Sequence, residues 1–282
     1  MEKIYEIFRC TILGIVQGLT EFLPISSSFH LRVVPSALGW PEVGISLSVF
    51  LHLGTLVGVL LFFGKDLWSI FLDGWKTLFI PTFSPNKFMT TMAWKIIIGS
   101  IPAVFFGFFF HDFFEQVDNN FYITASCLII VGLILWVSDT KGLHLKSIDQ
   151  LTWQNALIIG FAQASALIPG VSRSGATISM ARIFNFSREE AARFSFILGV
   201  PVIFGAGLLE TIKVIKHPSD MEVSMIACLA GFTSAAVVGF LSIKFLLKFL
   251  QTYSLAPFVF YRIVLGGIVL FCMYKGYLNN LK

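Results

Sequence analysis

Six segments of the chain each hold a mostly apolar run close to the length that crosses a lipid bilayer, which is about 20 residues for a helix. Backbone polar groups in lipid must bond within the protein, so runs of this length favour transmembrane helices. The segments are Ile45–Phe63, Lys95–Phe110, Phe121–Ser138, Ala191–Ile212, Val223–Phe245 and Pro257–Tyr274. Charged residues make up only 13% of the chain, against a usual ~25%. We therefore predict one integral membrane domain over residues 1–282, an all-α polytopic membrane protein.

The rest of the composition excludes several classes of protein. The formal net charge of +4 is spread along the chain, which argues against nucleic-acid binding and is compatible with an anionic lipid surface. The four cysteines lie in apolar segments without metal-ligand spacing, so we interpret them as packing residues. The segment Lys65–Lys87 mixes charged residues, tryptophans and prolines, and it predicts an interfacial helix followed by a loop.

Two further segments are apolar but interrupted. Residues 4–38 are broken at Pro24 and Pro35, and Trp153–Phe184 is broken at Pro169-Gly170. Each is too interrupted for one span, so we predict two re-entrant helical hairpins. Irregular backbone at membrane depth is tolerated only where protein or a water-filled cavity covers it. The hairpins are therefore the expected place for an active site.

The two halves of the chain match at one constant offset. The matched pairs are Gly14 with Gly160, Gln17 with Gln163, Ser26 with Ser172, Ser28 with Ser174, and Phe50 with Phe196. We predict a duplication, with repeat 1 at about residues 1–140 and repeat 2 at about 151–282, joined by the polar linker Asp139–Gln150. Each hairpin is followed by three spans, and an odd number of crossings inverts the second repeat relative to the first.

The distribution of positive charge orients this arrangement. One side of it carries most of the basic residues, and the positive-inside rule makes that side cytoplasmic. These residues are Lys65, Lys76, Lys87, Lys141, Lys146, Arg182, Arg188, Lys244 and Lys248, whereas Lys213, Lys216 and Lys275 fall on the opposite side. The first hairpin is then expected to enter from outside, and the second from the cytoplasm.

The first broken segment, QGLTEFLPISSSFHL, places polar groups inside an apolar run. Gln17 and Glu21 lie one helical turn apart on one face, and Ser26, Ser27 and His30 follow the break at Pro24. A carboxylate at bilayer depth costs roughly 2.5–3.5 kcal/mol or more, so such a residue indicates a functional site. The alternative is a serine-rich helix break with a satisfied histidine.

The second broken segment, PGVSRSGAT, supplies a cation. Glycines allow close backbone approach, serines offer hydroxyls, and the following helix points its N-terminal amides at the loop, which together predict an anion site. Arg173 adds a planar fork of donors suited to phosphate oxygens. The alternative is a structural ion pair between Arg173 and Glu21, and both interpretations bring the two loops together.

These two motifs resemble those of the bacterial undecaprenyl-pyrophosphate phosphatase family, which is associated with bacitracin resistance. The first matches at Gln17, Glu21, Pro24, Ser26, Ser27 and His30, and the second at Pro169, Gly170, Ser172, Arg173, Ser174, Gly175 and Thr177. The chain departs from the commoner family form at Gln17, where glutamate is usual, and at Ser28-Phe29, where threonine-glycine is usual. The resemblance implies hydrolysis of undecaprenyl diphosphate to undecaprenyl phosphate and phosphate, which recycles the lipid carrier of peptidoglycan and other envelope polymers.

The predicted catalytic residues are Glu21, Ser27, His30 and Arg173. Ser27 is the candidate nucleophile activated by His30, with a phosphohistidine at His30 or a water activated by it as alternatives. The predicted phosphate-binding residues are Ser26, Ser172, Arg173, Ser174, Gly175 and Thr177. Gln17 and Glu21 are the predicted ligands of a divalent cation, Mg²⁺ or Ca²⁺, because both are hard ions that take oxygen ligands.

The expected partners are a polyprenyl diphosphate lipid and the membrane, with no nucleic acid and with a homodimer as a candidate assembly. The expected location is the bacterial inner membrane, with the active site facing its outer side. A transporter or flippase of a phosphorylated polyprenyl lipid is the competing function, because paired broken helices in inverted repeats also serve alternating access. A structural scaffold would explain neither the buried charge nor the hydroxyl clusters.

Polar residues outside the motifs receive structural interpretations. His52, Lys95 and His111 lack a motif partner, so we interpret the first as a core imidazole and the other two as interfacial anchors. Glu210 is predicted to cap a helix at the interface. Ser195 and Thr55 are predicted to bond back to helix carbonyls.

Overall fold

The computed structural model describes residues 2–79, 91–110, 113–114, 120–142, 145–216 and 223–276. Within these ranges the chain is helical, with one isolated bridge between Lys146 and Phe186. Its helices are α1 (Glu2–Phe22), α2 (Ser27–Ala37), α3 (Ile45–Phe79), α5 (Met92–Phe109), α7 (Phe121–Thr140), η1 (Ile148–Gln150), α8 (Trp153–Ser165), α9 (Arg173–Ile183), α10 (Arg188–Lys216), α11 (Met225–Leu250) and α12 (Ala256–Tyr274). Six of them, α3, α5, α7, α10, α11 and α12, are long and apolar enough to cross a membrane. The predicted all-α polytopic fold is confirmed.

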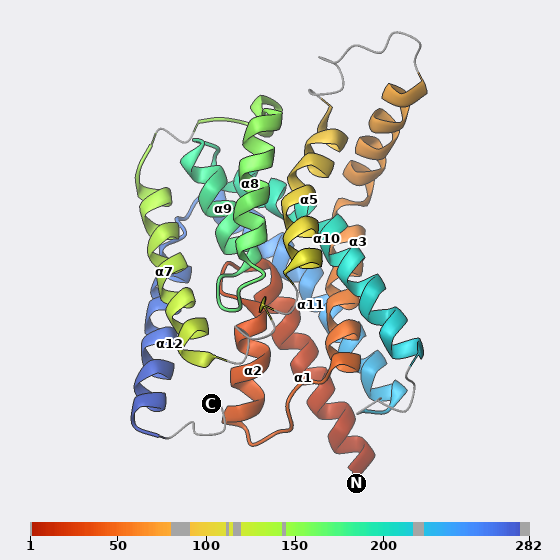
Figure 1. Cartoon of the computed structure of the whole chain (residues 1–282), viewed down its shortest axis with the longest axis vertical. Helices are drawn as coiled ribbons and strands as arrows, with labels where there is room; N and C mark the ends of the chain where they lie inside the picture. The colour runs from red at the N-terminus through yellow and green to blue at the C-terminus, as the bar shows by residue number, and fades with distance from the viewer. Residues whose placement is uncertain are drawn as a thin grey trace.

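The two broken segments form helical hairpins that enter the molecule from opposite ends. In Figure 1, α1 rises from the N-terminus at the lower end to mid-height and α2 returns, while α8 descends from the upper end and α9 returns. The breaks between the paired helices meet near the middle of the molecule. This arrangement is the one that an inverted repeat requires.

The breaks also share their local backbone. α2 and α9 begin at equivalent positions of the repeat, and the residue before each, Ser26 or Ser172, has a positive φ of 75° or 70°. A non-glycine residue in this region is strained and marks a site where the surroundings hold the backbone in place. In each break the strained serine contacts the serine two residues on, at 3.3 Å between hydroxyl oxygens. The two loops at equivalent positions of the predicted repeats therefore share one backbone conformation.

The halves interlock through helices that approach closely at glycines. α1 packs against α11, where a Cβ on Gly14 would overlap the Gly231 carbonyl, and α8 packs against α5, where a Cβ on Gly160 would overlap the Gly99 carbonyl. Small residues at helix crossings let backbones come together in membranes, where van der Waals packing holds helices in contact. The first helix of each repeat is thus fixed by a helix of the other.

We expect Gly14→Ala to destabilise the protein by about 1–3 kcal/mol, the usual cost of overpacking a tight contact. The new methyl group would meet the Gly231 carbonyl and the Ser234 hydroxyl, and backbone cannot move aside easily. The measurement is the thermal midpoint of the purified protein in detergent. Gly267→Ala is the control, since nothing lies within 4 Å of a Cβ there; equal midpoints for the two variants would contradict the close packing.

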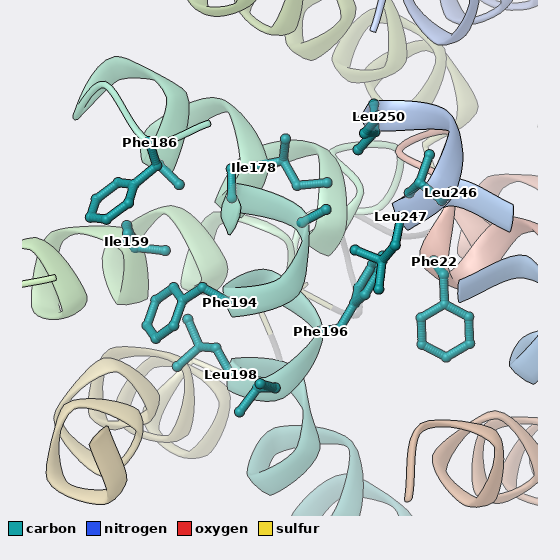
Figure 2. Close-up of a cluster of buried hydrophobic side chains, with 14 of the residues drawn as sticks. Phe22, Ile159, Ile178, Phe186, Phe194, Phe196, Leu198, Leu246, Leu247 and Leu250 are labelled. Carbon is teal, nitrogen blue, oxygen red and sulfur yellow. The ribbon is translucent and has the colours of Figure 1, made fainter. Parts of the chain in front are cut away.

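A buried apolar cluster lies behind the breaks and joins both repeats. Figure 2 shows Phe22 of α1 near Leu246 and Leu247 of α11, with Phe196 of α10 close by. The rings of Phe22 and Phe196 meet edge to face, with centroids 5.4 Å apart, a favoured geometry for aromatic pairs. Because Phe22 follows Glu21 in the chain, this cluster holds the carboxylate of the first motif in position.

Helix α3 differs from its prediction. The first span was predicted to end at Phe63, but the helix continues to Phe79, so Lys65 begins no separate interfacial helix. The charge is accommodated by pairing, since the Asp66 carboxylate lies 2.6 Å from Arg193 of α10. Trp68, Phe71 and Trp75 then stack along one exposed side. Residues 80–90, which include Lys87, lie outside the described ranges.

Two smaller predictions also need correction. Pro35 does not break the chain but lies inside α2, near its end. Asp139, predicted to open a polar linker, is buried; its carboxylate forms an ion pair with Arg182 at 2.9 Å and accepts a hydrogen bond from Arg188 at 2.8 Å. This buried ion pair ties the end of α7 to α9 and α10.

Candidate active site

A cavity of about 430 Å³ opens where the two helix breaks meet. Both breaks and the end of α1 contribute polar side chains to its wall, while α3 and α10 supply most of the rest. The polar residues from the hairpins are Glu21, Ser26, Ser27, Ser28, Ser172 and Arg173. The cavity therefore joins the two sequence motifs in one site.

Glu21 lies at the centre of the hydrogen bonds in this site and is only 8% exposed. Its Oε2 accepts from the Ser27 hydroxyl at 2.6 Å and from the Gln17 side-chain amide at 3.1 Å, and its Oε1 pairs with Arg173 Nη2 at 3.3 Å. The ion pair considered as a structural alternative is thus present. It also places a carboxylate in contact with a hydroxyl at the cavity wall, which is the arrangement of a base and a nucleophile.

Two helix N-termini face the same cavity. Ser27 is the first residue of α2 and Arg173 the first of α9. The N-terminal end of a helix carries partial positive charge and unbonded N–H groups, so two of them create a setting that favours anions. At α9 the Ser172 hydroxyl accepts from the Gly175 N–H at 3.1 Å and fixes the turn.

Arg173 crosses from α9 to α10. Its Nη1 donates to the Ser195 carbonyl at 3.1 Å, while its buried Nε has no hydrogen-bond partner among the described residues. Ser195 was predicted to bond back to a helix carbonyl, but its hydroxyl instead contacts the Thr177 hydroxyl at 2.6 Å. The prediction for Thr55 is confirmed, with a bond to the His52 carbonyl at 2.8 Å.

The guanidinium of Arg173 lies in space left by Gly199, where a Cβ would overlap Nη1. We expect Gly199→Ala to displace Arg173 and lower catalytic turnover by about 10²-fold, because misplacing a group by about 1 Å can cost that much. The fold should survive, since the obstructed atom is the far end of a side chain. Gly205→Ala on the same helix is the matched control, with nothing within 4 Å of its Cβ. Wild-type turnover in the Gly199 variant would contradict this role for the glycine.

His30 is placed differently from its prediction. It is buried beside the cavity, with Nδ1 2.7 Å from the Ser26 carbonyl and Nε2 2.7 Å from the Tyr261 hydroxyl. The Tyr261 ring stacks on the imidazole with centroids 5.6 Å apart. Both ring nitrogens are engaged, so the predicted contact between His30 and Ser27 is not formed. Ser27 bonds to Glu21 instead.

The predicted phosphate ligands divide into two groups. Ser26, Ser172 and Arg173 line the cavity, whereas three residues of the second motif lie behind it. Ser174 donates to the Leu23 carbonyl at 3.2 Å, and Thr177 donates to the Arg173 carbonyl at 2.8 Å. Gly175 packs against Ser172, since a Cβ added to Gly175 would lie 3.2 Å from the Ser172 side chain. Ser174 therefore joins the two breaks, and none of the three residues lines the cavity.

The two predicted metal ligands, Gln17 and Glu21, are hydrogen-bonded to each other. Glu21 lines the cavity, but Gln17 is fully buried and holds Glu21 from behind. In the described part of the chain, no group of three His, Cys, Asp or Glu side chains could hold a metal ion. A divalent cation commonly binds through one or two carboxylates plus substrate phosphates. Gln17 Oε1 is buried without a hydrogen-bond partner among the described residues, so the oxygens of Glu21 and Gln17 fit a cation that takes its remaining ligands from a bound phosphate.

Several polar residues differ from their structural interpretations. His52 of α3 and Glu210 of α10 both line the cavity, and Glu210 lies within its helix and not at the end. The spacing of Ser48 and His52, one helical turn apart, was the available signal, and Ser48 also lines the cavity. Lys95 is buried near Asp149 and is not an exposed anchor. His111 lies outside the described residues.

Residues 10–268 match the family described as bacitracin resistance protein BacA. A protein of Thermomicrobium roseum named undecaprenyl-diphosphatase is 44% identical over 274 residues, covering 94% of this chain and 97% of its own. Proteins of the same name from Geobacter metallireducens and a Nocardioides species are 43% and 40% identical, covering 93% and 96% of this chain and 97% and 98% of their own. The matches include both helix breaks.

Proposed function

The chain belongs to the bacitracin resistance protein BacA family, and we propose that it hydrolyses undecaprenyl diphosphate to undecaprenyl phosphate and inorganic phosphate. It is a membrane hydrolase that recycles the lipid carrier of cell-wall synthesis and confers resistance to bacitracin. The observation that carries this function is the contact of Ser27 and Arg173 with one buried carboxylate, Glu21, in a cavity between two helix breaks.

The residues of the cavity support nucleophilic catalysis. Ser27 Oγ attacks the terminal phosphorus, its proton passes to Glu21 Oε2, and the bond from phosphorus to the undecaprenyl phosphate oxygen breaks. Water then attacks the phosphoserine, the bond between phosphorus and Oγ breaks, and one proton of the water passes to Ser27 Oγ while its OH stays on the released phosphate. The proton on Glu21 leaves to solvent, which restores the carboxylate. Arg173 and the N-termini of α2 and α9 stabilise the phosphate oxygens during transfer. The 2.6 Å contact of Ser27 with Glu21 favours this assignment over a phosphohistidine at His30.

We include a divalent cation, Mg²⁺ or Ca²⁺, held by Glu21 and the diphosphate oxygens. When bound, it would neutralise negative charge on the two phosphates and help to orient them. Among the described residues no group of three His, Cys, Asp or Glu side chains could hold a metal ion, so the substrate must supply most of the other ligands. The cation is accordingly expected to bind more tightly with substrate than without it.

The test is phosphate release from a C55 polyprenyl diphosphate by the purified full chain in detergent, with and without a chelator. We expect release of one phosphate per substrate, loss of activity with chelator, and recovery with added Mg²⁺ or Ca²⁺. Folded protein that releases no phosphate under any of these conditions would exclude the function. Release that a chelator leaves unchanged would exclude only the cation.

Transport of a phosphorylated polyprenyl lipid is the competing function on an inverted-repeat scaffold. A transporter could use Arg173 to bind phosphate, but it would not need a hydroxyl in contact with a carboxylate. The pairing of Ser27 with Glu21 therefore favours hydrolysis. Reconstituted vesicles separate the two, since a transporter would move intact diphosphate lipid between leaflets without releasing phosphate.

We propose that the protein lies in the bacterial inner membrane, as a homodimer, with its cavity open to the outer side. The linker between the repeats carries Lys141 and Lys146 and is then cytoplasmic, while the loop between α2 and α3 is outside. In a cysteine-free background, a cysteine at the exposed Glu42 should react with an impermeant thiol reagent in intact cells, and one at Lys146 should not. The reverse pattern would exclude an outer-face site. The proposed homodimer is tested separately, by measuring the molar mass of the protein in detergent with light scattering.

A further inference from the structure

Arg262 of α12 is a fully buried cation whose partners are all backbone carbonyls. Its Nε donates to Leu128 at 2.9 Å, its Nη1 to Pro24 at 3.0 Å, and its Nη2 to Gly170 at 3.1 Å and to Val171 at 3.0 Å. Its exposed fraction is 0%, and no carboxylate of the described residues pairs with it. Burying a charge without a counter-ion is costly. A hydrophobic residue would serve a purely structural role better.

The carbonyls that Arg262 binds belong to both helix breaks. Pro24 lies in the break between α1 and α2, and Gly170 in the break between α8 and α9. They are equivalent positions of the repeat, at the same offset as Ser26 and Ser172. One guanidinium therefore bridges the two hairpins at equivalent residues, each two positions before a strained serine of the cavity wall, Ser26 or Ser172.

The neighbouring backbone is shaped to admit this side chain. A Cβ added to Gly132 of α7 would lie 3.2 Å from Arg262 Cβ, and one added to Gly175 of α9 would lie 3.0 Å from Arg262 Nη1. A planar fork can satisfy several carbonyls in fixed directions, which a flexible ammonium cannot. The geometry is that of a clamp between two loops.

We propose that Arg262 is a positioning residue that sets the separation of the two helix breaks, and so the placement of Ser27 and Glu21 relative to Arg173. It does not line the cavity and touches no reacting atom. Its effect on turnover rests on the proposed phosphatase function. Its effect on the distance between the hairpins does not.

The test uses the full chain with its four native cysteines replaced and spin labels on Leu38→Cys and Ile183→Cys. These positions are exposed at the far ends of α2 and α9, and they report the relative placement of the two hairpins by pulsed electron double resonance. Arg262→Gln removes the charge, and Arg262→Lys keeps it without the fork. Arg193→Gln is the control, because it removes an arginine that pairs with Asp66 of α3, away from the breaks and from both labelled positions.

We expect both Arg262 variants to broaden or shift the distance distribution and to lower kcat by about 10²-fold, the scale of a small misplacement of reacting groups. The control should keep the wild-type distribution and turnover. An unchanged distribution in Arg262→Gln, or full recovery of both readouts in Arg262→Lys, would overturn the proposal. If the glutamine variant does not insert, the lysine variant decides the question. If wild-type protein releases no phosphate, the phosphatase function fails and the distance measurement still tests the clamp.

Discussion

Arg173→Lys is expected to lower turnover by about 10²- to 10³-fold, although it keeps the positive charge. That range corresponds to roughly 2.7–4 kcal/mol, the usual cost of losing one preorganised donor from a site where charge develops. The fork of Arg173 contacts the Ser195 carbonyl with one nitrogen and Glu21 with another, and its Nε is buried without a hydrogen-bond partner among the described residues. A lysine ammonium can occupy only one of these positions.

The measurement is kcat and KM for phosphate release by membrane-inserted protein. Arg193→Lys is the matched control, because Arg193 also pairs with a carboxylate, that of Asp66, but does not line the cavity. We expect that control to retain nearly full activity. Near wild-type turnover in Arg173→Lys would remove the guanidinium from the phosphate site.

The division of roles between the repeats follows from residues that occupy equivalent positions. Ser27 and Arg173 are each the first residue of the returning helix of a hairpin, so both side chains point into the same cavity. Glu21 has Leu167 as its equivalent in the second repeat, where no carboxylate is available. In the proposed mechanism the nucleophile and the base therefore come from the first half of the chain and the cation from the second.

Local features of the site were predictable from the sequence, because proline and glycine interrupt a helix at their own positions and a buried charge is costly wherever it occurs. The breaks at Pro24 and Pro169-Gly170 lie where the motifs indicated, and α2 and α9 begin at equivalent positions of the repeat. The convergence of Glu21 and Arg173 also followed from the sequence, since a carboxylate and a guanidinium at membrane depth each need a partner.

Features that depend on contacts between distant helices were not predicted. His30 was paired with Ser27 on spacing alone, whereas the Tyr261 hydroxyl from α12 takes its Nε2. Gly199 carries no local signal, because only the arrival of Arg173 from α9 requires the space. Arg262 did have a signal in the sequence, since a charge inside an apolar span is costly and indicates a functional role.

Ser27→Ala is expected to lower turnover by at least about 10³-fold, since removing a catalytic nucleophile commonly costs that much or more. The Ser27 hydroxyl is the group that the Glu21 carboxylate contacts at the cavity wall. Ser28→Ala is the matched control, because Ser28 also lines the cavity but contacts the Ser26 hydroxyl and not Glu21. It should lose far less activity.

A second readout separates a serine nucleophile from a water molecule activated by Glu21. Substrate labelled in its terminal phosphate should leave label on the wild-type protein after rapid acid quenching, and Ser27→Ala should leave none. Glu21→Gln should reduce both the labelling rate and turnover, because the attacking hydroxyl would lose the carboxylate that accepts its proton. If Ser27→Ala kept most of its turnover while Glu21→Gln lost it, water would be the nucleophile, and Ser27 would serve only to orient the carboxylate.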